Sequence, residues 1–256
     1  MADLKPTNYN AGNPAHAGAD LSKFPDTLAA HLAGQPGADA MIARSLIPPG
    51  TAAARDFSAV GSHLPVYNPE SCTACMDCVN ICPDTALIPK VVGKEGLEEL
   101  AASGEDGKLA RDQFSETTAT YGLRLRRKQK QGDNYQGPEP GEFSIYVDPT
   151  NCKGCGECVE VCSEDALSMQ PKSDPSVVER ASRVYSTLEQ VAQDDRYVGN
   201  NLVTEGMLDE KMRGAVVGGA GNCPGCGETS ALRMIAGLAT KLYEKVGIVN
   251  ATGCST

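Results

Sequence analysis

Cysteine spacing is the feature that most constrains what this chain of 256 residues can fold into. Eight of its eleven cysteines form a C-x2-C-x2-C-x3-C run that occurs twice. The first run comprises Cys72, Cys75, Cys78 and Cys82, and the second comprises Cys152, Cys155, Cys158 and Cys162. The sequence Cys-Val-Asn-Ile-Cys in the first run corresponds to Cys-Val-Glu-Val-Cys in the second. We therefore expect two copies of one small thiol-rich unit.

The spacing is that of bacterial two-cluster ferredoxins, in which thiolates hold [4Fe–4S] cubes. Three thiolates at two-residue gaps can wrap one face of a cube, and the fourth binds the other cluster. Cluster I is therefore assigned to Cys72, Cys75, Cys78 and Cys162, and cluster II to Cys152, Cys155, Cys158 and Cys82. Small residues such as Ala74, Gly154 and Gly156 let backbone N–H groups approach the cluster sulfurs. Ser163 departs from the pattern, because a proline is expected there, as Pro83 follows the first run.

Other uses of cysteine are disfavoured by the same residues. A disulfide framework needs an oxidising compartment, and no secretory signal is recognised before these cysteines. Zinc normally takes thiolates from two separated pairs, and a C-x2-C-x2-C triple does not suit a tetrahedron. The pattern therefore predicts iron–sulfur clusters and electron transfer.

Composition narrows the class of protein further. Aromatic residues make up 5% of the chain, tryptophan is absent, and there are 27 glycines and 16 prolines. Such a sequence favours small modules held by clusters and partner contacts over one large core. The formal charge of −10 argues against nucleic acid as a partner. Because no stretch approaches the ~18–20 apolar residues that span a bilayer, we expect no membrane association and a soluble, cytoplasmic protein.

The region before the first cysteine run reads as an extended arm over residues 1–63. It is rich in Ala, Gly and Pro, with a short helix expected near Leu28–Leu32 and a turn at Pro48-Pro49-Gly50. The three histidines have no metal-ligand spacing and are expected to be surface residues. They are His16, His31 and His63.

Residues 64–172 are expected to form the two-cluster ferredoxin domain. Short strands are predicted at Leu64–Tyr67 and Ser144–Val147, one before each cysteine run. The runs are separated by an insertion at about 88–143, with a helix expected over Lys94–Ser103. The basic run at 124–130 is either a solvated face or a docking patch for an acidic partner.

A helical connector is expected over residues 173–213. Asp174 can cap a helix that has Pro175 in its first turn. Apolar residues then recur at three- and four-residue steps, which is the periodicity of a packed helix. They are Val178, Ala181, Tyr185, Leu188 and Val191.

The sequence changes character from Gly214 onwards, where Cys223-Pro-Gly-Cys226 precedes a periodic helix. Its predicted apolar face contains Leu232, Ile235, Leu238 and Leu242. A strand and a glycine turn that presents Cys254 are then expected. Read alone, the Cys-x-x-Cys pair is compatible with half a zinc ribbon or with a redox dithiol.

The combination of two ferredoxin runs, Cys-Pro-Gly-Cys-Gly-Glu-Thr and Asn-Ala-Thr-Gly-Cys-Ser resembles the pyruvate:ferredoxin (2-oxoacid:ferredoxin) oxidoreductases. The resemblance covers roughly residues 64–256. It implies that residues 214–256 begin a thiamine-diphosphate-binding domain, here truncated, and that a third, proximal [4Fe–4S] cluster lies beside the thiamine. The implied ligands of that cluster are Cys223, Cys226 and Cys254. The implied thiamine contacts are Glu228, Thr252, Gly253, Cys254 and Ser255.

The resemblance further implies an α+β fold and the conversion of a 2-oxoacid and CoA to acyl-CoA and CO2. Electrons would leave through the clusters to an external ferredoxin or flavodoxin. The family's fourth proximal ligand and the Gly-Asp-Gly segment that binds magnesium lie downstream of the matched region. No residue of this chain is therefore expected to be catalytic, and the remaining domains or subunits of an oligomeric enzyme are its expected partners.

Three hypotheses stay open at this stage. The chain is part of such an oxidoreductase, as a gene fragment or a truncated subunit. Alternatively, it is a stand-alone polyferredoxin-like electron carrier whose Cys-Pro-Gly-Cys segment is structural. The third hypothesis is an interaction module in which the clusters serve only to hold the fold.

Overall fold

The computed structural model describes residues 56–115, 141–194, 197, 206–214, 216–218, 221–244 and 246–247. The chain divides into two compact units, 1–54 and 55–256, and the described residues all belong to the second. Several predictions lie outside the described residues. They concern the helix near Leu28–Leu32, the turn at Pro48–Gly50, His16, His31, the basic run at 124–130 and the segment at 248–256.

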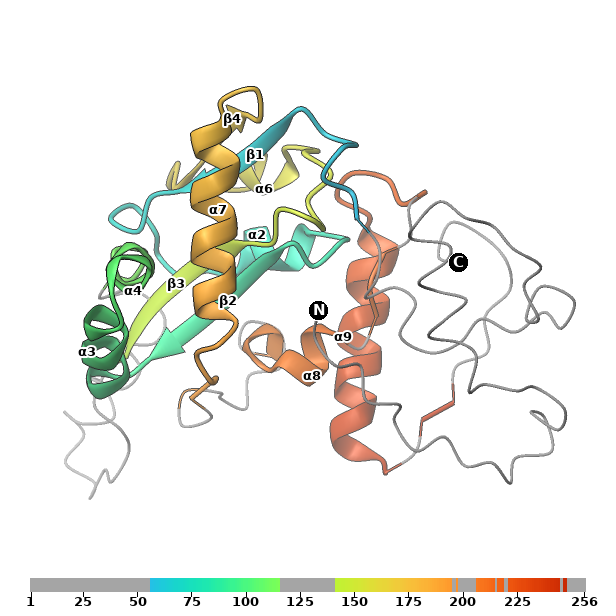
Figure 1. The fold of residues 1–256 in the computed structure, drawn as a ribbon. Coiled ribbons are helices and arrows are strands. Elements are labelled where there is room, and N and C mark those ends of the chain that lie inside the picture. The colour runs from blue at the N-terminus through green and yellow to red at the C-terminus, as the bar shows by residue number, and fades with distance from the viewer. Residues whose placement is uncertain are drawn as a thin grey trace, which may run out of the picture. The chain divides into compact units, whose positions relative to one another are not determined.

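Four strands form two antiparallel pairs (Figure 1). Strand β1 (His63–Tyr67) pairs with β4 (Leu167–Pro171), and β2 (Leu87–Val92) pairs with β3 (Glu142–Val147). Because β1 and β2 flank the first cysteine run while β3 and β4 flank the second, each pair joins one strand from each half. The two halves are therefore interlocked, and the expected strands before the two cysteine runs are confirmed.

Successive side chains along β2 and β3 point alternately into two separate cores. Leu87, Val91 and Ile145 contribute to a core that also contains Cys78, Cys152 and Cys158. The alternate residues Ile88, Val92 and Tyr146 contribute to a second core with Val184 and Leu188. This alternation is the period of two expected of a strand buried on both faces. It assigns the cysteines to one side of the strands.

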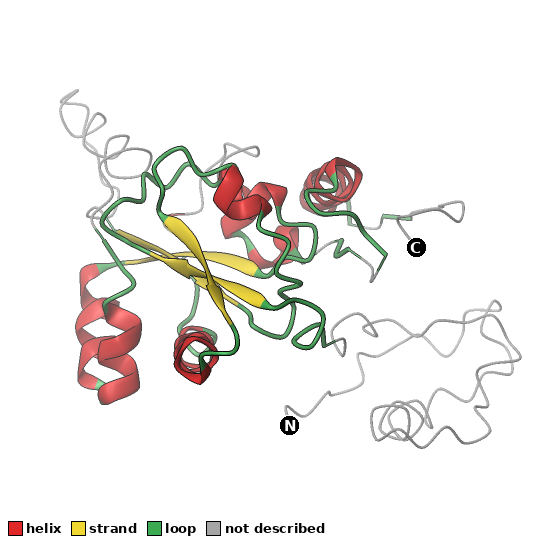
Figure 2. Cartoon of the chain, turned by 90° about the horizontal axis from the view of Figure 1, so that it is seen from above, coloured by secondary structure: helices red, strands yellow, loops and turns green. Residues whose placement is uncertain are grey.

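Helices cover both sides of these strands (Figure 2). The short helices α2 (Asp77–Ile81) and α6 (Glu157–Glu160) lie on the cysteine side. Helix α7 (Pro175–Leu188) lies on the other side and contacts β1 and β3. The expected cap is confirmed, since the Ser176 N–H donates to Asp174 Oδ1 at 3.0 Å. The expected connector thus packs directly on the ferredoxin strands, and α7 ends at Leu188, before Val191.

The insertion between the halves is shorter than expected at both ends. Residues 88–92 belong to β2 and residues 142–143 belong to β3, and these strands pair over their full length. Between them lie α3 (Lys94–Ala102), which confirms the expected helix, and α4 (Glu105–Arg111). Arg183 of α7 ties α4 to the module through a 2.6 Å ion pair with Asp106.

The C-terminal elements are a 3-10 turn, η6 (Gly206–Leu208), and helices α8 (Glu210–Arg213) and α9 (Gly227–Leu242). Helix α8 packs closely on α9, because a Cβ on Gly237 would lie 2.1 Å from Met212 Cγ. None of the helices within the described ranges is long and apolar enough to cross a membrane.

The expected apolar face of α9 is half-buried at Leu232 and Leu238 and exposed at its other two residues. Ile235 and Leu242 are each 65% exposed, whereas Arg233 and Ala236 are buried. Arg233 lies on the side of α9 that reaches backbone carbonyl groups of the ferredoxin module.

Candidate metal centres

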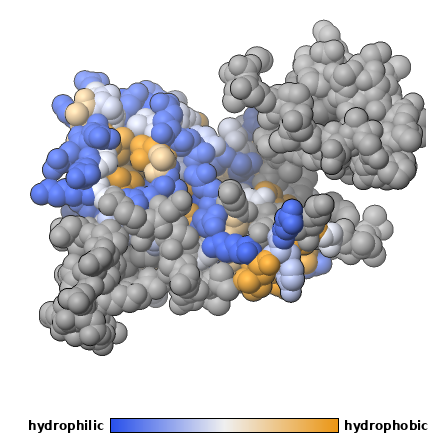
Figure 3. All heavy atoms as spheres, turned by 90° about the horizontal axis from the view of Figure 1, so that it is seen from below, coloured by the Kyte–Doolittle hydropathy of each residue, from blue (hydrophilic) through white to orange (hydrophobic). Residues whose placement is uncertain are grey.

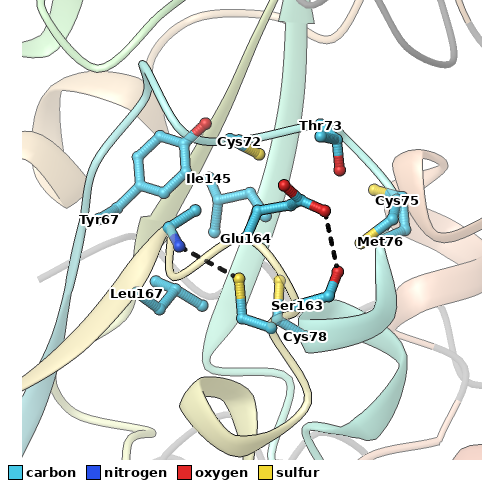
Figure 4. Close-up of a pocket in the computed structure, with 12 residues that line it drawn as sticks. Tyr67, Cys72, Thr73, Cys75, Met76, Cys78, Ile145, Ser163, Glu164 and Leu167 are labelled. Carbon is cyan, nitrogen blue, oxygen red and sulfur yellow. Dashed lines mark hydrogen bonds between the residues drawn. The ribbon is translucent and has the colours of Figure 1, made fainter.

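The first cysteine-lined cavity has an empty volume of about 360 Å³ (Figure 4). Its cysteines are Cys72, Cys75, Cys78 and Cys162. Three come from the first run, and the fourth is the last cysteine of the second run. Tyr67, Met76, Ile145 and Leu167 complete much of the wall.

The second cavity is closely similar, with an empty volume of about 370 Å³. Its cysteines are Cys82, Cys152, Cys155 and Cys158. The structure therefore brings together the two sets of four that the spacing predicts, including the exchange of the last cysteine of each run. All eight of these cysteines are free thiols in the structure.

The donor chemistry of both cavities fits an iron–sulfur cube. Within the described ranges, no three or more His, Cys, Asp or Glu side chains are placed to hold a single metal ion. The cysteines instead surround two hollows, each with four sulfur donors and largely apolar walls. Four thiolates are the ligand set of a [4Fe–4S] cluster.

Left-handed backbone geometry shapes both cysteine loops. Ala74 and Met76 have positive φ in the first loop (56° and 73°), and Gly154 and Gly156 have positive φ in the second (70° and 86°). The Ala74 N–H already points to sulfur, since it donates to Cys72 Sγ at 3.4 Å. Gly154 is also required by space, because a Cβ there would lie 2.7 Å from the His63 carbonyl oxygen. The loops are thus wound so that backbone donors can approach cluster sulfurs.

Burial keeps several ligand thiols protonated when no metal is bound. It raises the pKa of Cys152 to about 11 and that of Cys158 to about 12. Burial also raises the pKa of Cys78 well above its usual value. Because only the thiolate binds iron, cluster assembly must displace these protons.

The apo-protein should therefore lose stability in alkali. A thiol whose pKa is raised in the folded state contributes stability below its unfolded pKa near 9, and that stability is lost as pH rises through 11–12. We expect the free energy of unfolding of the apo-protein to fall by on the order of a few kcal/mol as the pH rises from about 9 to about 12. Denaturant titrations at several pH values measure it. Apo Cys152→Ala and Cys158→Ala should each show a smaller fall, and an unchanged pH dependence in both would contradict the assignment.

Tyr67 is the main polar group of the first cavity that the sequence did not single out. Its hydroxyl is buried and has no hydrogen-bond partner of normal geometry among the described residues. It lies beside the sulfur of Cys72 (Figure 4), where its interaction opposes the rise in the Cys72 pKa caused by burial. Val147 occupies the equivalent repeat position in the second half. The hydroxyl is thus a candidate donor to one cluster and not the other.

Tyr67→Phe should make the potential of cluster I more negative. A donor to sulfur stabilises the reduced, more negative cluster, so its removal should cost about 1 kcal/mol, or some tens of millivolts. An EPR-monitored redox titration of the reconstituted protein measures both midpoints. Tyr146→Phe is the matched control, because Tyr146 belongs to the core on the other side of the strands. Equal shifts in the two variants would exclude a local effect of the Tyr67 hydroxyl.

The Cys-Pro-Gly-Cys segment forms a turn at the start of α9. Cys226 is the residue before the helix, Cys223 is exposed, and Gly225 has a φ of +58°. The Thr229 hydroxyl donates to Cys226 Sγ at 3.5 Å, and hydrogen bonds from Thr229 lower the Cys226 pKa. A Cβ on Gly225 would lie 3.1 Å from Glu157 Oε2, so this turn lies next to the second cysteine loop.

The other residues of the expected thiamine site are only partly described. Glu228 lies exposed in the first turn of α9. Thr252, Gly253, Cys254 and Ser255 lie outside the described residues. The structure therefore places Cys223, Cys226 and Glu228 at the N-terminal end of α9.

Comparisons with known proteins agree with the cysteine chemistry. A family model described as a 4Fe-4S dicluster domain matches residues 64–163, and one described as a 4Fe-4S single cluster domain matches residues 145–227. The chain is 27% identical to a probable pyruvate-flavodoxin oxidoreductase of Escherichia coli, over 99% of this chain and 20% of that protein. It is 28% identical to a pyruvate:ferredoxin oxidoreductase of Moorella thermoacetica, over 77% of this chain and 14% of that protein. A mitochondrial pyruvate dehydrogenase [NADP(+)] of Euglena gracilis is 29% identical, over 77% of this chain and 9% of that protein.

These matches and the two cavities define the chain as a 4Fe-4S protein of the two-cluster ferredoxin class. Its sequence is similar to an iron–sulfur portion of pyruvate-ferredoxin and pyruvate-flavodoxin oxidoreductases. It spans one fifth or less of the length of these three relatives.

Proposed function

We propose that this chain carries electrons within an enzyme that oxidises a 2-oxoacid such as pyruvate, with CoA as acyl acceptor. The pair of four-cysteine cavities is the observation that carries the proposal, because each provides a complete ligand set for one [4Fe–4S] cluster. Cluster I would be held by Cys72, Cys75, Cys78 and Cys162, and cluster II by Cys82, Cys152, Cys155 and Cys158. When bound, the clusters accept and release single electrons.

The chain's own residues bind, enclose and tune these clusters. Apolar side chains such as Ile145 and Leu167 limit access of water to the first cavity. The left-handed loops present backbone N–H groups to sulfur, which stabilises negative charge. The interlocked strand pairs hold the two cavities in one module, so an electron can pass between them without a change of fold.

The proposal keeps the domain boundaries of the sequence prediction. Residues 1–63 would be an arm, 64–172 the ferredoxin domain, 173–213 a connector and 214–256 the beginning of the thiamine-diphosphate domain. A third cluster would be bound by Cys223, Cys226 and Cys254 with a further ligand from outside this segment. Glu228, Thr252, Gly253 and Ser255 would contact thiamine diphosphate, whose magnesium would be held elsewhere in the enzyme.

The exposed side of α9 supports a larger assembly. Ile235, Leu242 and Tyr243 are each 65–66% exposed. Figure 3 shows hydrophobic residues grouped on the surface that is seen from below. Large apolar side chains grouped on one helix commonly mark an interface. We propose that other domains or subunits of an oligomeric enzyme cover them and that an external ferredoxin or flavodoxin accepts the electrons. A reducing compartment such as the cytoplasm would keep the thiols available.

A stand-alone electron carrier is the competing function, because both cysteine cavities are complete within this chain. The deciding experiment uses the protein in which this segment resides and measures viologen reduction that depends on both a 2-oxoacid and CoA. We expect such activity in the native protein and at least a tenfold loss in Cys75→Ser. Arg183→Gln, which changes an exposed ion pair of α7, is the control and should keep the native rate. No 2-oxoacid-dependent reduction by the native protein would contradict the enzyme function and leave the carrier.

A further inference from the structure

Arg233 is a buried cation that the ligand scheme does not use. It is 1% exposed, on a helix whose Ile235 and Leu242 are exposed. Nη2 donates to the carbonyl oxygen of Cys82 at 2.8 Å and to that of Asn80 at 3.3 Å. Nη1 is buried without a hydrogen-bond partner among the described residues. Since arginine stays charged in proteins, a full positive charge lies against the backbone of a cluster II ligand.

The contacts around Arg233 join α9 to the end of α2. The Ser230 hydroxyl donates to the Asn80 carbonyl at 2.6 Å, and the Gly218 N–H donates to the Pro83 carbonyl at 2.9 Å. These groups satisfy carbonyls that a helix leaves unpaired at its C-terminus. Capping alone could be done by neutral donors, as Ser230 and Gly218 do, so it does not explain why a buried charge is placed there.

The two cysteine cavities differ at this position. The Cys82 carbonyl accepts from the Thr85 N–H at 3.4 Å, and the Cys162 carbonyl accepts from the Asp165 N–H at the same distance. The Cys82 carbonyl accepts the hydrogen bond from Arg233 in addition to the one from Thr85. Cavity II also contains Lys153, paired with Asp84 at 3.2 Å, and Glu157, whereas Glu164 is the charged residue that lines cavity I. The charged side chains that line the two cavities therefore sum to the same formal charge, and Arg233 is the charge that distinguishes the surroundings of cluster II.

We propose that the Arg233 guanidinium is a fixed positive charge that raises the reduction potential of cluster II relative to cluster I. Reduction adds one negative charge to a cluster, and a buried cation stabilises the reduced form more than the oxidised form. Helix α9, which begins at the Cys-Pro-Gly-Cys turn, thus makes cluster II the preferred location of an electron in the module. Arg233 is a positioning and tuning residue, not a ligand.

The test compares Arg233→Lys, Arg233→Met and the native chain after anaerobic reconstitution. Redox titration followed through the paramagnetically shifted cysteine β-proton NMR signals assigns each midpoint potential to its cluster. We expect Arg233→Met to lower the equilibrium constant for reduction of cluster II about tenfold, a shift of about 59 mV for one electron. Cluster I should change less than twofold. Arg233→Lys should keep most of the native value, because it keeps the charge.

Two further variants separate charge from packing. Arg183→Gln removes one positive charge on the other side of the strands and should leave both potentials unchanged. Ser230→Asp places a carboxylate beside the guanidinium, since Ser230 Oγ lies 3.4 Å from Nη2, and should lower the cluster II potential while Arg233 is retained. If Arg233→Met does not take up both clusters, Ser230→Asp tests whether charge at this position sets the cluster II potential.

The inference rests on the proposed ligation, and iron content distinguishes the two. If the native chain binds no clusters, the proposed function fails. If it binds about eight irons and neither Arg233→Met nor Ser230→Asp lowers the cluster II potential, the tuning role alone is wrong. Equal shifts in Arg233→Lys and Arg233→Met would also overturn it, because packing and not charge would then be responsible.

Discussion

Cys82→Ser is expected to abolish the cluster whose other three ligands lie 70 or more residues further along the chain. Cys82 is the last cysteine of the first run but lines the cavity formed by Cys152, Cys155 and Cys158. Serine nearly keeps the size of the side chain and removes the thiolate that iron requires. We therefore expect iron content to fall from about eight to about four per chain, with cluster I intact.

Iron and acid-labile sulfide assays measure the loss, and EPR identifies the cluster that remains. The matched variant Cys162→Ser should lose cluster I instead, because Cys162 lines the other cavity. Cys223→Ser is the control and should keep both clusters. If Cys82→Ser and Cys72→Ser leave the same surviving cluster, the exchange of ligands between the two runs is wrong.

Removal of both clusters is expected to have the largest effect on stability. Cys78, Cys152 and Cys158 belong to the same core as Leu64, Val79 and Phe143, so the metal sites are part of the packed interior. A ligand present at about 1,000 times its dissociation constant stabilises the folded state by about 4 kcal/mol. For a chain of this size, that corresponds to a melting temperature about 8–16 °C higher in the loaded protein.

Thermal unfolding of the reconstituted and chelator-treated protein, under anaerobic conditions, measures this difference. Far-UV circular dichroism reports secondary structure, and near-UV signals report packing around the clusters. The exposed ion-pair variant Arg183→Gln should shift both forms equally. Equal melting temperatures for the loaded and metal-free native protein would contradict a structural role of the clusters in this core.

The sequence predicted the parts of the fold in which local chemistry decides structure. The cysteine spacing led to two sets of four residues that the structure brings together, and Asp174-Pro175 marked the start of α7. Short hydrophobic strands were also recognisable, because they stand at equivalent positions before the two cysteine runs.

Long-range contacts explain what the sequence did not show. Most of strand β2 lies in the segment expected to be an insertion, and Pro89 and Lys90 interrupt its hydrophobic pattern. A proline is tolerated here because β2 pairs with β3 alone in the part of the chain that the structure describes. Lys90 is 2% exposed, and its ammonium donates to the carbonyls of Leu188 and Val191 at the end of α7. Such a partner nearly a hundred residues away cannot be found from periodicity.

The same limit applies to the orientation of α9. Its leucine pattern indicated an apolar face, and the structure in addition buries Arg233 against carbonyl groups at the end of α2. A local hydrophobic pattern cannot distinguish the face that packs within one module from the face available to another. Tyr67 escaped notice for a related reason, since only the folded loop places its hydroxyl beside Cys72.

Anaerobic reconstitution of the native chain followed by iron counting and an EPR-monitored reductive titration tests the central claim most directly. The account predicts about eight irons and eight sulfides in the two-cluster module, with both clusters reduced reversibly at low potential. About twelve irons would show that the third cluster also assembles and would agree with the ligand scheme. Four or fewer irons, or clusters that cannot be reduced, would contradict an electron-transfer function.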